Sequence, residues 1–221
     1  MNYVFQFGPI FRHSDELIYG AVRTMELTAA SSAIGFVIGL AGALARSFGP
    51  IWLKRIVAVY VEIIRNTPLL VQLYFVFFSL PLMGVKLSSD QAAILALSIH
   101  LGAYAVEILR AGIQSIPGGQ IEAAKSLGLS RRQIIRHVIV VPAARAVYPA
   151  LTSQFILQLL GTSIVSAIAA EELTAVANNL AMQTFRNFEI YIVIAIIYFI
   201  LVRACSLLFR LVSLVLFRWK A

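Results

Sequence analysis

Long apolar stretches constrain the fold of this chain more than any other feature of its sequence. A helix needs about 20 apolar residues to cross the hydrocarbon core of a bilayer. Five stretches approach or exceed that length, at about 17–44, 56–80, 91–109, 146–170 and 189–208. Hydrophobic residues make up 60% of the 221 residues and charged residues only 13%, against about 25% charged in soluble domains. The sequence therefore predicts an all-α integral membrane protein, one domain over 1–221 with about five transmembrane helices.

The basic residues predict how these helices are oriented. The net charge is +8, and the positive side chains gather in alternate connections and at the C-terminal end: Arg46, Lys54 and Arg55, then Arg110 to Arg145, then Arg210, Arg218 and Lys220. Cytoplasmic loops carry an excess of Lys and Arg. We therefore expect the N-terminus outside and the C-terminus in the cytoplasm. Because the arginines flank apolar runs, the charge argues against a nucleic-acid partner.

The longest polar connection, between the third and fourth expected spans, predicts two short helices. A turn at Pro117 precedes residues 120–127, which are strong helix formers. Gly128 is placed to end that helix in a left-handed conformation. Ser130 and Gln133 have the S-x-x-Q spacing of a capping box, so a second helix is expected to start at Ser130.

The same connection carries a family resemblance. Glu122, Ala123 and Ala124 are followed by Gly128 four residues later and by Pro142 after fourteen more. This pattern resembles the cytoplasmic coupling loop of membrane subunits in binding-protein-dependent importers that are driven by ATP-binding-cassette subunits. A chance match in a soluble helix is the alternative, but the position between apolar spans, in the most basic connection, favours the coupling loop.

The resemblance implies an ATPase on a different chain. A coupling loop over 111–145 would dock on a cytoplasmic dimer of ATPase subunits, with Arg131 as a further contact. The sequence contains no G-x-x-x-x-G-K-[ST] loop to hold ATP phosphates. We therefore expect no cofactor on this chain, with ATP and Mg bound by the partner.

Two further stretches are similar to the polar-amino-acid branch of this importer family. They are residues 65–75, RNTPLLVQLYF, and the pattern A-Y-x-x-E-x-x-R from Ala103 to Arg110. The resemblance implies import of a polar, charged amino acid or a related opine across the bacterial inner membrane. It also implies a second permease subunit, either a similar chain or another copy, and an extracytoplasmic solute-binding protein. The A-Y-x-x-E-x-x-R residues are expected to brace the coupling loop.

Polar residues in the fourth span suggest a solute path. Gln154, Gln158 and Thr162 are four residues apart and form a stripe that should face a partner helix or a path for solute. Family members often carry a lysine and an acidic or amide residue just before the position of Thr162, where this chain has Leu160 and Gly161. This difference weakens any transfer of substrate contacts from relatives to this chain. The candidate solute contacts are Gln158, Thr162, Ser163, Glu171 and Glu62.

Several of these residues also have structural interpretations. Glu171 could attract a cationic solute or only solvate an outer loop. Glu62 could pair with Arg65, three residues on, and both could reach the cytoplasmic interface. Pro68 should kink or interrupt the second span, and His100 is expected to be a packing residue.

Two other classes of protein, a secondary carrier and an enzyme, fit the sequence less well than the importer. A proton- or ion-coupled carrier could use His100, Glu62, Glu107 and Glu171, but such carriers usually contain internal repeats, and none is evident. An enzyme is disfavoured because H-E-x-x-H, G-x-S-x-G and metal-ligand clusters are missing from the sequence.

Overall fold

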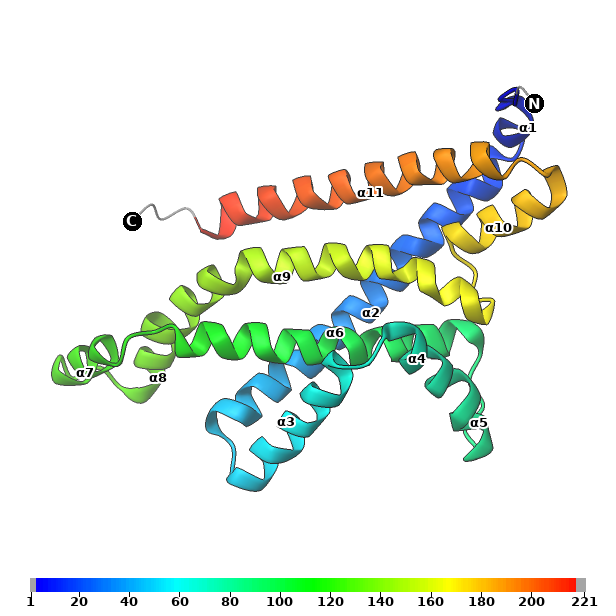
Figure 1. Ribbon diagram of the computed structural model, residues 1–221. Coiled ribbons are helices and arrows are strands. Elements are labelled where there is room, and N and C mark those ends of the chain that lie inside the picture. The colour runs from blue at the N-terminus through cyan, green and yellow to red at the C-terminus, as the bar shows by residue number, and fades with distance from the viewer. Residues whose placement is uncertain (1–2, 218–221) are drawn as a thin grey trace.

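The computed structural model describes residues 3–217, and this part of the chain is helical without strands (Figure 1). Arg218 and Lys220, which entered the charge argument, lie outside the described residues. The elements are α1 Gly8–Phe11, α2 Ser14–Phe48, α3 Ile51–Arg65, α4 Leu69–Tyr74, the π-helix η1 Phe75–Ser79, α5 Leu80–Leu82, α6 Ser89–Gln114, α7 Gly118–Ser126, α8 Arg131–Gln133, the π-helix η2 Ile134–Val140, α9 Val141–Gly161, the 3-10 helix η3 Thr162–Ile168, α10 Leu173–Thr184 and α11 Asn187–Leu216.

Helices α2 and α6 form the centre of the bundle, and small residues allow them to pack closely. A Cβ atom added at Gly35 would lie 2.9 Å from Leu101, and one added at Gly39 would collide with Ala105. Small residues are typical of helix contacts inside membranes because they let two backbones approach. The G-x-x-x-G pattern of Gly35 and Gly39 therefore serves helix packing here.

The second expected span is broken in two. Helix α3 ends at Arg65 and α4 begins at Leu69. The helical segment Leu69–Leu82 is bent by 110° relative to α3. Pro68 cannot donate a backbone hydrogen bond, so the predicted interruption is confirmed. Gln72 closes the break, because its Nε2 atom donates to the carbonyl oxygens of Ile64 and Thr67 at 2.8 and 3.0 Å. Within residues 3–217, four helices are long and apolar enough to span a membrane, or five if the bent pair is one span.

The fourth expected span is part of a longer helix. The sequence places residues up to 145 in a loop, but the chain is continuously helical from Arg131 to Ile168. Pro142 lies inside this helix, directly after η2. A proline interrupts the hydrogen-bond ladder and crowds the preceding turn, and π-helical turns are a known site of such irregularities. The helix therefore passes Pro142 instead of starting after it.

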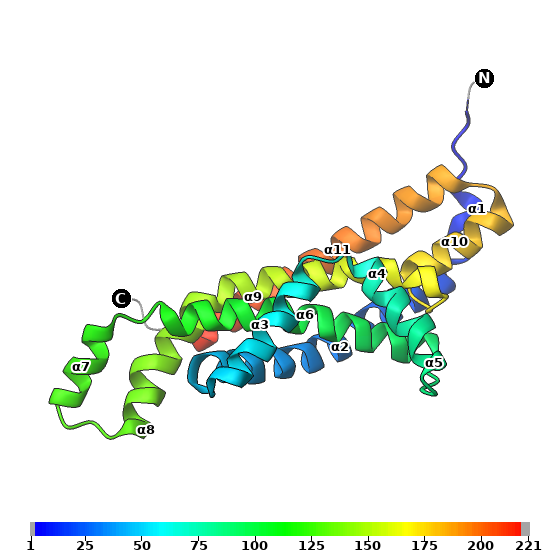
Figure 2. The same ribbon diagram turned by 60° about the horizontal axis from the view of Figure 1, so that its bottom comes forward.

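Helix α11 lies along one side of the bundle, beside α9 and α10 (Figure 1). In both views α7 and α8 project from one end of the bundle, and the C-terminal end of α11 points the same way (Figure 2). The N-terminal residues and α10 lie at the other end. The two ends of the described chain are therefore at opposite ends of the bundle, while their sidedness in the membrane stays a prediction.

Candidate coupling surface and solute path

The turn between α7 and α8 has the local geometry that the sequence predicts. Gly128 has a φ of +76°, so it occupies the left-handed region that favours glycine. The N–H groups of Leu127 and Leu129 donate to the carbonyls of Ala123 and Ala124 at 3.0 and 3.1 Å, which closes the end of α7. Ser130 caps the next helix with both bonds of a capping box. The predictions for Gly128 and for the capping box are confirmed.

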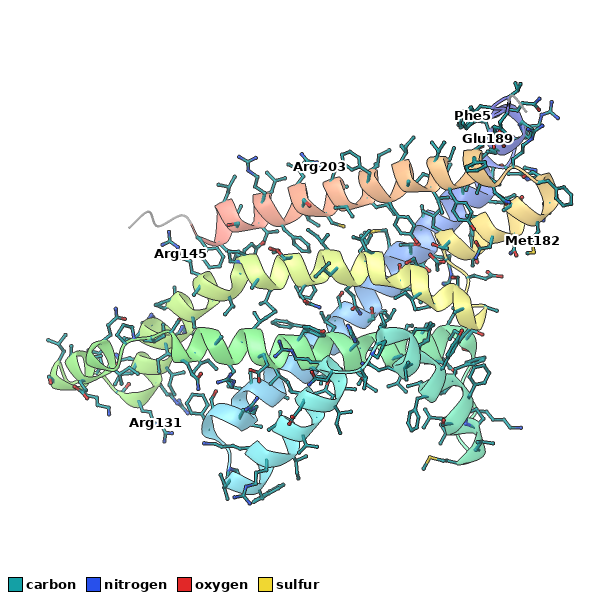
Figure 3. The ribbon with its side chains drawn as sticks, viewed as in Figure 1. Phe5, Arg131, Arg145, Met182, Glu189 and Arg203 are labelled. Carbon is teal, nitrogen blue, oxygen red and sulfur yellow. The ribbon has the colours of Figure 1, made fainter. Side chains whose placement is uncertain are left out.

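The exposed side of this turn defines what a partner could touch. Glu122, Ala123 and Arg131 are exposed, and Leu127 is 80% exposed. Arg131 points away from the bundle (Figure 3). Ala124 is only 6% exposed and packs within the chain, whereas the side chain of Ala123 faces outward. The two side chains diverge because consecutive helical residues point about 100° apart.

An ion network lies just ahead of the coupling region. Glu107 accepts hydrogen bonds from Arg46 of α2 and from Arg110, whose Nη2 atom is 2.7 Å away. Arg110 also donates to Gln114 at 2.6 Å. The carboxylate of Glu107 thus joins the end of α2 to the last turns of α6, directly before α7. The network ties the end of α2 to α6, and the expected brace of the coupling loop itself stays a prediction. Arg46 is a member that sequence reasoning missed.

Charged side chains also line a cavity of about 440 Å³ between α2, α3 and α6. Its lining residues are Arg46, Ala58, Val61, Glu62, Arg65, Asn66, Tyr104 and Glu107. The expected pair of Glu62 with Arg65 does not form, because the Arg65 guanidinium lies 5.3 Å from the centre of the Tyr104 ring instead. Ionisable residues inside membrane spans are costly and often mark a path for solute or ions.

A smaller cavity, of about 150 Å³, is also bordered by Tyr104. His100, Tyr104, Gln154 and Gln158 contribute to its wall. The Nδ1 atom of His100 is 3.0 Å from Oε1 of Gln72, and its ring packs 5.0 Å from that of Tyr104. His100 therefore has the packing role expected from the sequence.

Gln158 and Thr162 are bonded inside the protein. Gln158 is 2% exposed, and its Nε2 atom donates to Ser31 Oγ at 3.1 Å and to the Leu97 carbonyl at 2.9 Å. Thr162 is fully buried and donates to the carbonyl of Leu159 at 2.7 Å. Gln158 thus faces the partner helices α2 and α6, while Gln154 lines the smaller cavity, so the stripe meets both of its expected environments.

The other candidate contacts lie apart from these. Ser163 borders a cavity of about 520 Å³ between the end of α9 and α11, and its hydroxyl donates to the Leu160 carbonyl at 2.7 Å. Glu171 is exposed and accepts a hydrogen bond from Tyr19 at 3.0 Å. The five candidate solute contacts therefore do not form one site.

Glu172, the residue after Glu171, links two helices, and sequence reasoning missed its contact with the second. It is fully buried and caps α10 by accepting from the Ala175 N–H at 2.8 Å, while Tyr198 of α11 donates to its other oxygen at 2.7 Å. Burial raises the pKa of the Glu172 carboxyl, against the effect of these hydrogen bonds. The sequence signal for the cap is an acidic residue directly before the start of a helix, because such residues are preferred N-caps. No group of three or more His, Cys, Asp or Glu that could hold a metal occurs in residues 3–217.

The comparison with known proteins agrees with this geometry. Residues 35–217 match the family of the binding-protein-dependent transport system inner membrane component. The chain belongs to this family. It is 37% identical over 196 residues to the glutamine transport system permease protein GlnP of Escherichia coli K12, covering 88% of this chain and 90% of GlnP. The L-cystine transport system permease protein TcyB of Bacillus subtilis is 36% identical over 203 residues, which cover 91% of this chain and 87% of TcyB.

A solved structure shows the same fold. The crystal structure of an amino acid ABC transporter with histidines matches with a TM-score of 0.88 and 37% identity, over 96% of this chain and 99% of that one. The protein is thus a multi-pass transmembrane permease subunit of an ABC importer, with the type I permease fold, and it is not itself an enzyme.

Proposed function

We propose that this permease imports a polar, charged amino acid or a related compound across the bacterial inner membrane. The observation that carries the amino-acid class is the family match over 35–217 together with relatives named for glutamine and L-cystine transport. The charged class rests on the resemblance of residues 65–75 and 103–110 to the polar-amino-acid branch. The partners are a cytoplasmic dimer of ATPase subunits that bind ATP and Mg, a second permease subunit and an extracytoplasmic solute-binding protein. The N-terminus is outside, so α7 and α8 face the cytoplasm.

The coupling surface consists of the exposed side of α7 and the turn after it. Glu122, Ala123, Gly128 and Arg131 contact the ATPase, while Ala124 and Pro142 shape the turn and the helix behind it. Helix α7 packs against η2, which is continuous with α9 and η3. A movement of α7 therefore passes along one helix into the centre of the bundle. ATP binding can drive transport only if the ATPase prefers one of two states of this helix.

The solute path runs past Tyr104, because this ring borders both the cavity that contains Glu62 and the cavity that contains Gln154 and Gln158. Glu62 is the acidic group of the path. Ser163 and Glu171 lie at the opposite end of the proposed path. Thr162 holds η3 in place through its hydrogen bond and does not contact solute. We expect Glu62→Gln and Glu171→Gln to lower uptake of cationic amino acids and to leave ATPase co-purification unchanged. Unaltered uptake would remove that residue from the path.

The decisive experiment places the permease, its ATPase and its binding protein in lipid vesicles and measures uptake of a radiolabelled amino-acid panel with and without ATP. We expect ATP-dependent uptake of one charge class. Uptake that follows a proton gradient and ignores ATP would instead establish a secondary carrier, which family membership does not favour.

A glycine pair tests the coupling surface. Gly128→Asp adds charge at a positive φ in open space, and Gly84→Asp does the same at a φ of +86° in a connection at the other end of the bundle. We expect Gly128→Asp to reduce ATPase co-purification at least tenfold and Gly84→Asp to leave it intact. Equal yields for the two variants would rule out the proposed surface.

A further inference from the structure

Arg203 lies near the middle of α11, the most apolar and least buried of the helices long enough to span the membrane among residues 3–217. Its side chain is exposed and points away from the rest of the protein (Figure 3). No part of the proposed transport mechanism uses it. An arginine at such a position requires an explanation, because guanidinium keeps its charge at all relevant pH values and is costly in hydrocarbon.

The two faces of α11 differ in their surroundings. Tyr198 and Phe209 lie on the face that packs against the bundle, where they bond to Glu172 and Tyr148. Arg203 lies on the opposite face, between Ile200 and Leu207, which are 57% and 58% exposed. This is the face that a surrounding lipid would contact.

Arg210 lies on the same face, because seven residues correspond to about two helical turns. It is also exposed. Neither Arg203 nor Arg210 has a hydrogen bond or an ion pair with any of the described residues 3–217. The two arginines, whose Cα atoms are about 10.5 Å apart along the helix, therefore face outward from an apolar surface without an anionic partner among residues 3–217.

We propose that Arg203 and Arg210 bind the phosphate of an anionic lipid in the leaflet that surrounds the C-terminal half of α11. The expected end of the last span, at 208, is five residues beyond Arg203, or about 7.5 Å along the helix. A long side chain can extend from this depth toward the headgroups. Arginine suits phosphate because its planar fork forms two parallel hydrogen bonds.

A second copy of the chain fits this face less well than lipid. A two-fold contact through α11 would bring like charges together, because the same surface is used by both subunits. Glu62 is an exposed carboxylate whose side chain makes no hydrogen bond within residues 3–217. It lies on α3, on the opposite side of the bundle from α11 (Figure 1). A symmetric pairing across α11 therefore does not supply the missing anion.

Native mass spectrometry of the purified permease–ATPase complex tests this site. The complex is loaded from nanodiscs of phosphatidylglycerol or of phosphatidylcholine, and the retained lipids are counted. We expect Arg203→Gln to lower phosphatidylglycerol retention several-fold and Arg210→Gln to lower it less, with no effect on phosphatidylcholine. Arg55→Gln, which removes an exposed arginine from α3, is the matched control and should retain lipid as the unmodified chain does.

Arg203→Lys separates binding from folding, because it keeps the charge and loses the planar fork. It should fold normally and retain an intermediate amount of phosphatidylglycerol. Equal retention by the unmodified, Gln and Lys forms would overturn the proposal. Loss of a second permease subunit from the Arg203→Gln complex, without loss of lipid, would overturn it in favour of a protein partner.

Discussion

Helices α2 and α11 are both long and apolar, yet they join the bundle in different ways. Helix α2 packs on α6 through Gly35 and Gly39, with the two backbones close together. Helix α11 is attached at separate polar points along its length. These are Glu189 with Tyr3 and Gln6, Tyr191 with Asn178, Tyr198 with Glu172, and the Phe209 carbonyl with Tyr148.

The difference in how the two helices are held follows from the surrounding lipid. Lipid tails are as apolar as leucine, so no hydrophobic force drives one membrane helix onto another. Association then depends on close van der Waals contact or on hydrogen bonds between helices. Close backbone packing distinguishes α2, whereas α11 combines apolar contacts of Ile190 and Ile194 near its start with hydrogen bonds along its length. The central pair should therefore be sensitive to added volume, and the outer helix to loss of single polar groups.

The largest effect is expected at Gly39. Gly39→Leu places a side chain against the Cβ and backbone atoms of Ala105, which cannot move without separating α2 from α6. The cost should reach or exceed the roughly 3 kcal/mol at the upper end of typical overpacking penalties. We expect loss of monodisperse protein in detergent gel filtration.

Ala204→Leu is the control, because it introduces the same leucine side chain at an exposed position on α11. It should leave the elution profile and the thermal midpoint nearly unchanged. If both substitutions are tolerated equally, close packing is not what holds α2 in place.

Local features of this fold were predictable from the sequence. The left-handed Gly128 and the capping box of Ser130 depend on residues within one turn, and the break at Pro68 follows from its missing N–H. Each is set by backbone chemistry that neighbouring residues do not override. The conformation of the α7–α8 turn, on which the proposed coupling depends, is therefore predictable from the sequence.

Other features depend on contacts that are distant in sequence. The helix continues through Pro142, although a proline usually marks a boundary. Glu172 is a buried link between α10 and α11 because Tyr198, 26 residues away, donates to it. Arg46 reaches Glu107 across 61 positions. No periodicity in the sequence indicates which polar groups will meet across helices, so the solute-path residues were the least predictable.

The second prediction concerns Glu172. Glu172→Ala leaves the Ala175 N–H and the Tyr198 hydroxyl without their acceptor, at about 1–3 kcal/mol for each buried group. We expect a lower thermal midpoint and greater protease sensitivity in α11. Undiminished protection of α11 would show that this attachment contributes little.

The pH dependence of stability gives a separate test at the same residue. Because burial raises the pKa of Glu172, the folded state holds the proton more tightly than the unfolded state. Its contribution to stability is complete below the ordinary carboxyl pKa and is lost as pH rises through the raised value. The unmodified chain should therefore lose more stability than Glu172→Gln as the pH rises above the ordinary carboxyl pKa. Parallel profiles for the two proteins would contradict the assignment.

The smallest effect is expected at Tyr148, whose hydroxyl donates to the Phe209 carbonyl at 2.6 Å. Tyr148→Phe keeps the ring packing against Phe217 and removes only the hydrogen bond. Such bonds between membrane helices contribute about 0.6 kcal/mol on average. Chemical unfolding in detergent should show a loss of this size, while Tyr74→Phe, at a partly exposed tyrosine on α4, should show none. A loss as large as that of Glu172→Ala would mean that α11 depends on one dominant attachment instead of several small ones.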